Sequence, residues 1–531
     1  MPIAPTYPGI YIEELPSSAH TIIPAPTSIT VFVGYTHPFK TVAFDSAVEI
    51  FGFTDFERQF GGFFSSGVID TSLPKAVYEF FLNGGSDAYV VGLQASYWDA
   101  SAPPPAAPVD KGIIVAATLT LNGIQLTARE PVDATPMYVT INNLKTTTAT
   151  NDTADVTVSY GSRSETYRGV SLNSTSNSFI ETRLGTAANP ISQLVTVGPN
   201  PAYPTGFTAV NQQQIAYAAG PPFTVNAPDP GWGGWSATDY IAAFEDDQSL
   251  DKVPIFNLLV LPGVSDAGVW SDALAFCERK RAFAILDPPE NAVADPSGAP
   301  QPMIADVMNN LVPKSTNGAL YFPYLISPNP STGQNEPVAP SGFVAGIYAR
   351  TDTNRGVWKA PAGYEAVVNN TVGVVPSGKM TDARQGTLNP LGVNCLRTFP
   401  GVGTVVFGAR TLVTTNVSLQ QWWYVPVRRM ALFIEQSLYF NLGWAVFEPN
   451  DEPLWIALRT TVEKFMLSLF NQGAFQGTTP SQAFQVKCDG TTTTQDDIDR
   501  GIVNVIVAFA PLKPAEFVVV QIALLAGQTS S

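Results

Sequence analysis

Two tracts rich in proline and glycine limit what this sequence can fold into. They are SAPPPAAP at 101–108 and GPPFTVNAPDPGWGGW at 220–235. Proline and glycine at this density end helices and strands, so both tracts are typical of linkers between folded segments. The sequence outside the two tracts follows one pattern, and the sequence between them follows another. We therefore expect one domain that is split in the chain by an inserted domain.

The outer segments alternate strand and helix patterns. TSITVFVGYT (27–36) has the continuous apolar run of a buried strand. AVYEFFLNGGSDAYVVGL (76–93) predicts a helix that ends at two glycines and is followed by a strand. After the second tract the same patterns return, with a buried strand in 252–263 and a helix followed by a strand in 269–289. Such alternation indicates an α/β fold.

The segment between the tracts is rich in threonine, valine and serine and has few helix-forming residues. Stretches such as LTLNGIQLTA and ADVTVSY alternate apolar and polar residues, which is the period of a half-buried strand. We expect an all-β insert there.

From about residue 391 a third region combines two helix patterns with the final strands. The helix in 453–472 places Leu454, Leu458, Val462, Phe465 and Leu469 at helical spacing, which predicts a face packed on the core. Its polar face carries Arg459 and Lys464.

The expected fold is a multidomain α/β (α+β) chain. Its parts are an N-terminal arm (1–24), a split α/β domain (25–100 and 236–390), an inserted β-rich domain with flanking linkers (101–235), a C-terminal α+β domain (391–513) and a C-terminal arm (514–531).

Both ends of the sequence predict strands without a partner nearby. An isolated strand of this length is unstable in water, and an unpaired apolar edge invites pairing with another chain. The strands either pair within their own subunit or join another one. The residues expected to pair are Tyr7, Gly9, Ile10, Tyr11, Ile12 and Glu13 in the first arm, and Phe517, Val518, Val519, Val520, Gln521 and Ile522 in the second.

The charge of the chain argues against a broad electrostatic contact with nucleic acid or anionic lipid, because the net charge is −16. The segment from residue 391 onward contains 9 Lys/Arg and 10 Asp/Glu, so nearly all of the net negative charge lies upstream of it. Charged residues make up 14% of the chain, well below the roughly 25% of ordinary soluble domains. We expect much of the surface, above all in the C-terminal region, to face other subunits.

No nucleotide site is expected. GVVPSGKM (373–380) matches the glycine and lysine positions of a phosphate-binding loop, but Met380 stands where a hydroxyl should ligate magnesium. TDARQGTLNP, which follows, is not expected to form the helix that such a loop precedes.

Catalytic and metal-binding patterns are also missing. The chain has two histidines, His20 and His37, so any catalytic triad would have to use one of them. The three cysteines, Cys277, Cys395 and Cys488, are far apart in sequence and are expected to be reduced structural thiols. The acidic pair in TTTTQDDIDRG is expected to cap a helix rather than to bind a cation. We expect neither an enzyme nor a cofactor.

Several blocks of the sequence, in order, resemble the sheath subunit of contractile phage tails and of related bacterial contractile injection systems. The blocks are PGIYIEE (8–14), VFVGYT (31–36), FERQFGG (56–62), FFLNGGSDAYVV (80–91), PSGFVAGIYARTDTNRGVWKAPAG (340–363), LNPLGVNCLR (388–397), GARTL (408–412), YVPVRRM (424–430), VFEPNDEPLW (446–455) and PAEFVVVQI (514–522). LTARE (126–130), SETYRGVSL (164–172) and SQLVTV (192–197) resemble the outer domain of the family less closely, because PVDATP follows LTARE where many relatives have a Gly-rich turn with a tryptophan.

This resemblance implies a structural protein that polymerises as stacked hexameric rings around an inner tube and contracts without nucleotide hydrolysis. It implies that the two arms add strands to neighbouring subunits and that the C-terminal region, with Arg459 and Lys464 as candidates, faces the tube. The implied partners are other copies of the chain, the inner tube protein, baseplate and terminal cap proteins and sister sheath subunits, without nucleic acid or membrane insertion.

The resemblance does not separate a phage tail from a non-viral injection particle. No secretory signal is recognised at the N-terminus, so assembly in the bacterial cytoplasm is expected. The alternative is a surface-binding protein that recognises a carbohydrate or receptor through its β insert.

Overall fold

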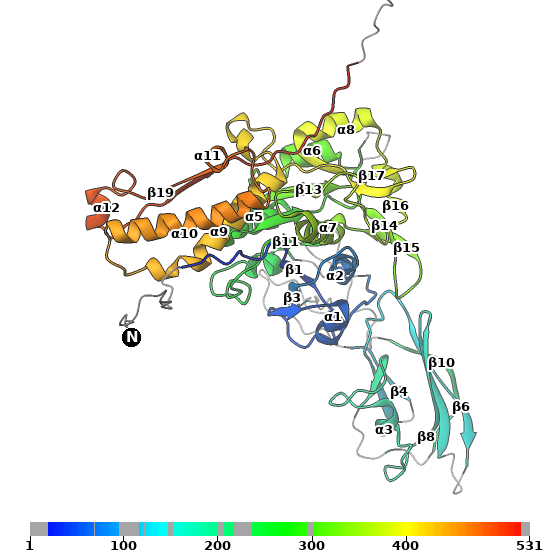
Figure 1. The fold of residues 1–531 in the computed structure, drawn as a ribbon. Coiled ribbons are helices and arrows are strands. Elements are labelled where there is room, and N and C mark those ends of the chain that lie inside the picture. Colours follow the sequence, from blue (N-terminus) through cyan, green and yellow to red (C-terminus); the bar gives the residue numbers. More distant parts are fainter. Residues whose placement is uncertain are drawn as a thin grey trace, which may run out of the picture. The chain divides into compact units, whose positions relative to one another are not determined.

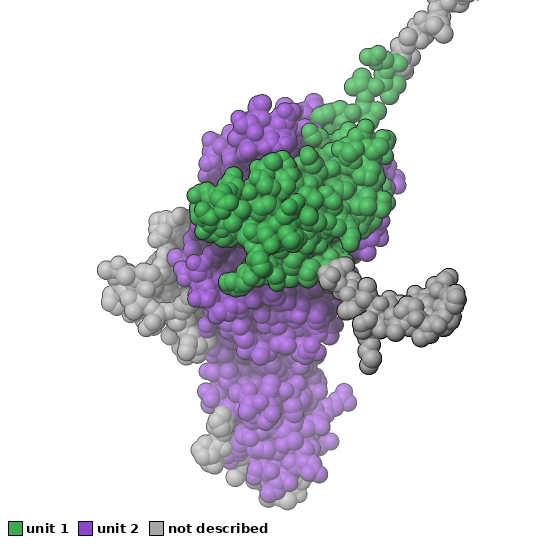
Figure 2. Space-filling model, turned by 60° about the vertical axis from the view of Figure 1, so that its left-hand side comes forward, with its two compact units in different colours: residues 1–26, 355–359, 426–531 green, residues 27–354, 360–425 purple. Residues whose placement is uncertain are grey.

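The computed structural model describes residues 20–67, 69–94, 116–121, 123–146, 152–198, 203, 206–216, 236–294 and 301–521. By its internal contacts the chain divides into two compact units (Figure 2). Unit 1 comprises Met1–Pro26, Arg355–Lys359 and Pro426–Ser531, and unit 2 comprises Thr27–Asn354 and Ala360–Val425. The mixed α/β, multidomain class expected from the sequence is confirmed.

Unit 2 is built on an eight-stranded sheet with the order β18-β17-β13-β12-β11-β1-β3-β2. The strands from β17 to β3 run parallel, and β18 and β2 are antiparallel edges. Their bounds are β1 Thr30–Tyr35, β2 Ala47–Ile50, β3 Ala88–Leu93, β11 Leu258–Val260, β12 Phe283–Leu286, β13 Gly318–Phe322, β17 Val393–Phe399 and β18 Gly403–Val406.

Helices cover this sheet, which explains why its central strands are continuously apolar. All six residues of β1 are buried, with Val31 and Val33 in the same core cluster as Trp270 of α5 (Ala267–Lys280). Phe32 contacts the ring of Phe80 on α2 (Ser72–Leu82), with ring centroids 5.3 Å apart. The other helices of unit 2 are α1 Phe53–Phe60, α4 Ala237–Ala242, α6 Ile304–Asn310, α7 Pro340–Arg355 and α8 Asp382–Leu388.

The boundary between sheet and C-terminal region differs from the one expected at residue 391. β17 pairs in parallel with β13 (Leu320↔Val393), and β18 returns along it, so both strands complete the large sheet of unit 2. The first four residues of β17 are buried. The C-terminal unit begins at Pro426 instead.

The segment expected to be an all-β insert forms two antiparallel sheets and one short helix, α3 (Ile180–Leu184). Burial alternates along β7 as the sequence pattern predicts, and the two sheets share a core of their own. One sheet has the order β4-β5-β9 (Thr118–Leu121, Ile124–Ala128, Val195–Val197), and the other has the order β10-β6-β7-β8 (Val210–Ile215, Met137–Lys145, Thr153–Tyr160, Arg163–Ser171). A third small sheet of unit 2 joins β15 (Asn335–Val338), β14 (Leu325–Pro328) and β16 (Gly373–Val374).

Unit 1 packs two long helices, α9 (Val425–Asn441) and α10 (Glu452–Asn471), against each other (Figure 1). Met430 and Phe433 of α9 share a core with Val462 and Phe465 of α10. All five apolar residues predicted to form the inner face of α10 are buried. The remaining elements are α11 (Pro480–Ala483), β19 (Phe484–Lys487), α12 (Gln495–Asp499) and β20 (Ile506–Phe509). Among the described residues no helix has the length and apolar character to cross a membrane.

Glu79 on α2 is a carboxyl group buried beneath the small sheet of unit 2. Its Oε1 accepts hydrogen bonds from Ser327 Oγ (2.7 Å) and Asn370 Nδ2 (2.8 Å), and its Oε2 has no partner among the described residues. The residue is only 2% exposed. Burial raises the pKa of Glu79 to about 7, although both hydrogen bonds act in the opposite direction. This carboxyl group is therefore partly protonated in the folded protein at neutral pH.

Replacing Glu79 should change how stability depends on pH. Since its pKa rises from 4.5 to about 7 on folding, the folded chain retains a proton that the unfolded chain releases. The contribution of this group to the free energy of unfolding is complete below about pH 4.5 and falls by up to about 3 kcal/mol as the pH rises to 7. Urea unfolding at pH 5 and pH 8 should show a smaller difference in Glu79→Gln than in the native chain. The exposed control Glu57→Gln should keep the native difference, and a Glu79→Gln variant that also kept it would contradict the assignment.

Candidate functional site

The strand pair β19–β20 is the element of unit 1 best suited to receive another strand. The two strands are antiparallel, with Phe484 opposite Phe509 and Lys487 opposite Ile506. In the described part of the chain each pairs only with the other, so both outer edges are open. One face packs on unit 1, because Phe475 lies 5.7 Å from Phe509 and 6.2 Å from Phe484 between ring centroids. The pair thus has a supported face and two edges of unpaired main-chain groups, the arrangement that strand addition requires.

The predicted C-terminal arm follows directly on β20. Residues 512–521 form no strand, although they are rich in β-forming side chains. Phe517, Val518, Val519 and Val520 are 74 to 83% exposed, and Gln521 is exposed as well. Ile522 and all six predicted residues of the N-terminal arm (Tyr7, Gly9, Ile10, Tyr11, Ile12, Glu13) lie outside the described residues.

The two cations predicted to face an inner tube have different surroundings. Arg459 is half-buried and donates a hydrogen bond to the carbonyl oxygen of Cys488 at 3.3 Å. Lys464 is exposed on the same helix. Arg459 therefore helps to hold the end of β19 against α10, and Lys464 is the cation of this pair that an outside partner can reach.

The phosphate-loop match at 373–380 is explained by packing. Gly373 and Val374 form β16, and Gly378 lies against Pro323, where an added Cβ would come within 2.2 Å of the proline side chain. The expectation that no helix follows was wrong. α8 forms because Thr381 Oγ1 accepts a hydrogen bond from the N–H of Arg384 and caps its first turn.

The place where doubly wound sheets bind ligands is filled by side chains. Strand order reverses between β1 and β11, and in such sheets ligands bind beyond the carboxyl ends of the strands at this reversal. Here Tyr35, at the end of β1, donates a hydrogen bond to Asp239 Oδ2 (3.0 Å) and accepts one from the N–H of Ser236 (2.8 Å). The rings of Tyr35 and Tyr240 also meet edge to face, with centroids 5.8 Å apart.

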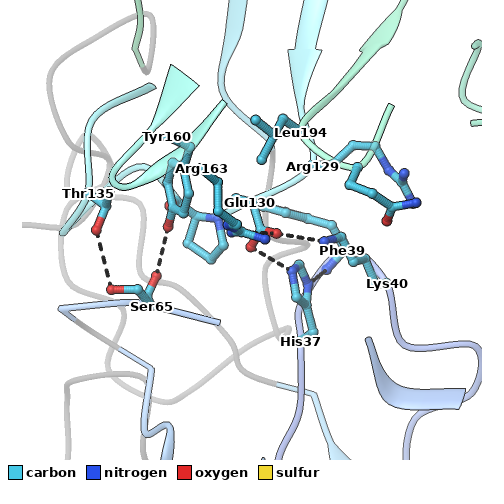
Figure 3. A network of polar contacts seen from close by, with 12 residues as sticks. His37, Phe39, Lys40, Ser65, Arg129, Glu130, Thr135, Tyr160, Arg163 and Leu194 are labelled. Atoms are coloured by element: carbon cyan, nitrogen blue, oxygen red, sulfur yellow. Dashed lines mark hydrogen bonds and ion pairs between the residues drawn. The ribbon is translucent and has the colours of Figure 1, made fainter. Parts of the chain in front are cut away.

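Glu130 lies at the centre of a buried polar network where the β insert meets the α/β part of unit 2 (Figure 3). Its Oε2 lies 3.0 Å from His37 Nε2, and its Oε1 lies 2.6 Å from Lys40 Nζ and 3.0 Å from the Arg163 guanidinium. Burial alone would raise the pKa of Glu130, but these three partners outweigh it and lower the pKa to about 2. The sequence carried no signal for this cluster, because its members are distant along the chain.

The two histidines have different surroundings. Burial lowers the pKa of His37, so the neutral imidazole donates from Nε2 to Glu130, while its Nδ1 accepts the N–H of Phe39 at 3.2 Å. Both ring nitrogens are thus used. His20 stacks on Trp444. In the part of the chain that the structure describes, no group of three or more His, Cys, Asp or Glu residues could hold a metal ion. Asp497 forms a capping box with Thr494 at the start of α12, so the expected helix cap is confirmed.

Neutralising Glu130 should weaken the junction of the insert. Glu130→Gln leaves Lys40 and Arg163 without their carboxylate, and loss of one member of a buried ion pair costs about 3–5 kcal/mol. Thermal unfolding at pH 7 should show a lower transition temperature for this variant than for the exposed control Glu245→Gln. Because folding lowers the pKa of Glu130 from 4.5 to about 2, its contribution to the free energy of unfolding should be complete at pH 5 and should be lost progressively as the pH falls from about 4.5 to about 2. Equal transition temperatures for the two variants would contradict this role.

Comparisons with known proteins give a consistent family. The model of the phage tail sheath protein central domain matches residues 233–412, and that of the phage tail sheath C-terminal domain matches residues 418–524. A tail sheath protein of Vibrio phage KVP40 is 24% identical over 210 residues, 40% of this chain and 29% of that protein. A prophage major tail sheath protein of Pseudomonas aeruginosa is 25% identical over 282 residues, 50% of this chain and 65% of that protein. The matched region thus spans less than two thirds of either relative.

Solved structures show the same fold over nearly the whole chain. A chain of the anti-feeding prophage baseplate is 22% identical with a TM-score of 0.57, and the alignment covers 98% of this chain and 99% of that one. A chain of the contracted PVC sheath complex, an extracellular contractile injection system, is 21% identical with a TM-score of 0.57 and 98% coverage of both chains. The sheath tail protein of Desulfitobacterium hafniense is 12% identical with a TM-score of 0.52, covering 95% of this chain and 100% of that one. At these identities the likeness establishes the fold alone.

Proposed function

Since this chain belongs to the phage tail sheath family, we propose that it is the structural subunit of a contractile sheath. In this proposal, copies of the chain polymerise as stacked hexameric rings around an inner tube. Contraction of the sheath then drives the tube through a target envelope without nucleotide hydrolysis. The filled crevice at Tyr35 and the packed glycine at 378 support a mechanism that uses no nucleotide.

The open strand pair of unit 1 is the observation that carries the proposal. Among the described residues, β19 and β20 have two unpaired edges, and residues 512–521 after β20 form no strand and include exposed apolar side chains. Strand addition between subunits would pair the open edges and bury the exposed apolar side chains. Each main-chain hydrogen bond would contribute about 0.5–1.5 kcal/mol. We propose that residues 7–13 and 517–522 are the added strands and that β19–β20 of neighbouring copies receives them.

The proposed partners follow from this role. They are further copies of the chain, the inner tube protein, baseplate and terminal cap proteins and sister sheath subunits. Energy for contraction would come from exchanging one set of packing contacts between globular parts for another, while the arms keep the subunits connected. The particle would be a phage tail or a phage-tail-like injection particle.

Removing an arm should abolish assembly without unfolding the subunit. Electron microscopy of the purified full chain should show regular hollow tubes, and a variant lacking residues 1–15 should show discrete particles. In the second arm, Val519→Pro removes a main-chain donor from a residue that is in no strand and 82% exposed, so it should reduce tube formation with little effect on the subunit. Val519→Ala keeps the donor and should assemble. Tubes of normal length from the truncated chain would sink the proposal.

Reversing the charge of Lys464 should weaken binding of the inner tube. Lys464→Glu changes an exposed residue, so polymerisation and thermal stability should stay native while co-sedimentation with the tube protein falls. Lys464→Gln should give an intermediate loss, because it removes the charge without reversing it. Arg459→Glu is a poorer probe, since Arg459 also bonds to Cys488. Native co-sedimentation of Lys464→Glu would contradict a tube contact there.

A further inference from the structure

Residues 20–26, which follow the predicted strand of the N-terminal arm, are bound to unit 1, and we call them the root of the arm. Ile22 is buried in the core of this unit. Asn441, the last residue of α9, binds both main-chain polar groups of Ile23. Its Oδ1 accepts from the N–H at 3.1 Å, and its Nδ2 donates to the carbonyl at 2.9 Å. Two residues on, Ser437 Oγ accepts the N–H of Ala25 at 3.0 Å.

A ring stack completes the root. His20 and Trp444 lie parallel, with centroids 3.7 Å apart and ring planes at 4°. Trp444 belongs to the short turn Gly443–Ala445 that follows α9. The stack and the Asn441 bonds hold both ends of 20–23, so the folded unit fixes the point from which residues 1–19 depart.

Large apolar side chains are exposed around this point. Val446 and Phe447 directly follow the turn that carries Trp444, and Tyr439 and Phe440 form the last turn of α9 beside Asn441. The rings of Tyr439 and Phe440 contact each other edge to face, 5.3 Å between centroids. We call the following exposed residues the arm-root patch: Ile23, Tyr439, Phe440, Val446 and Phe447.

Phe447 is the most unusual member of the patch. Its side chain is fully exposed, and its φ of 70° lies in the left-handed region that favours glycine. A bulky residue held in this conformation is strained, and such outliers gather at binding sites. Phe447 gains no burial within the described residues that would offset the strain. The contact that does so is therefore to be sought in another molecule.

We propose that the arm-root patch docks on a second copy of this chain, the copy whose strand pair receives the N-terminal arm. This inference rests on the proposed function. Glu13, the end of the predicted arm strand, and His20 are seven residues apart, which an extended chain spans in at most about 25 Å. A neighbour that holds residues 9–13 must present its surface within this distance of the root. The patch is the apolar surface that this neighbour covers, and apolar patches of this kind mark protein interfaces.

The substitution Phe447→Asn separates assembly from folding. Asparagine adopts the left-handed conformation more readily than phenylalanine, so the thermal unfolding temperature of the unassembled variant should equal or exceed that of the native chain. The protein concentration needed for tube formation should rise about tenfold or more, because a buried aromatic contact is lost. Val417→Ala, which trims another exposed apolar side chain, should leave this concentration unchanged. Tube formation by Phe447→Asn at the native concentration would overturn the inference.

A photo-crosslinking amino acid at position 447 identifies the occupant. In assembled full-length protein mixed from ¹⁴N- and ¹⁵N-labelled chains, crosslinks should join light to heavy chains. Crosslinks confined to residues 1–19 of the same chain, or formed only with an added inner tube protein, would overturn the inference. The variant lacking residues 1–15 keeps the two proposals apart. If it forms no tubes while Phe447→Asn forms them at the native concentration, the arm linkage stands and the patch assignment fails. The opposite result refutes the arm linkage and leaves the patch as a contact between copies that does not depend on the arm.

Discussion

The proposed assembly depends on main-chain hydrogen bonds at the outer edges of β19–β20. A two-stranded sheet is marginal in water, and here α10 supports it by burying an apolar stripe while Arg459 holds the end of β19. The outer edges remain without partners in the described residues, and Phe517 to Val520 extend into solvent beyond them. In the proposed strand addition, the bonds that complete this sheet would also join subunits, which would couple the stability of this element to assembly.

The junction between the β insert and the α/β part of unit 2 is held by a buried network of charged and polar groups. Glu130 is enclosed by His37, Lys40 and Arg163, and any other arrangement of the two parts would leave a charge buried without a partner. Forming such a network adds little net stability, but removing one partner leaves a buried charge uncompensated. Hydrogen bonds from Tyr160 to the carbonyl of Pro131 and from Ser66 to Asp133 extend the polar contact around the network. The insert is therefore seated in one orientation on the α/β part of its unit.

Local sequence patterns predicted much of this fold, whereas contacts between residues far apart in the sequence could not be predicted. β1, α2 and the inner face of α10 follow from runs and periods within a few turns of chain. The placement of β17 does not, because its apolar residues could suit any sheet and only pairing with β13 assigns it. The helix α8 was not predicted because its sequence has only a weak helical pattern, and the hydrogen bond to its threonine cap depends on local geometry. Glu130 and His37 are 93 residues apart, and no spacing rule connects them. The arm strands were predicted from their composition, but the neighbouring sequence does not indicate which strands they pair with.

The contact between Asn441 and Ile23 involves only main-chain atoms of Ile23. The carboxamide of Asn441 binds the main-chain N–H and C=O of residue 23, so these two hydrogen bonds can form with any side chain at that position. The side chain at position 23 can therefore differ without any change in α9, whereas Ile22 and His20 hold the root through their side chains. In a sheath built as proposed, the part of the arm before residue 20 could be exchanged while the root and the body of the subunit stay the same.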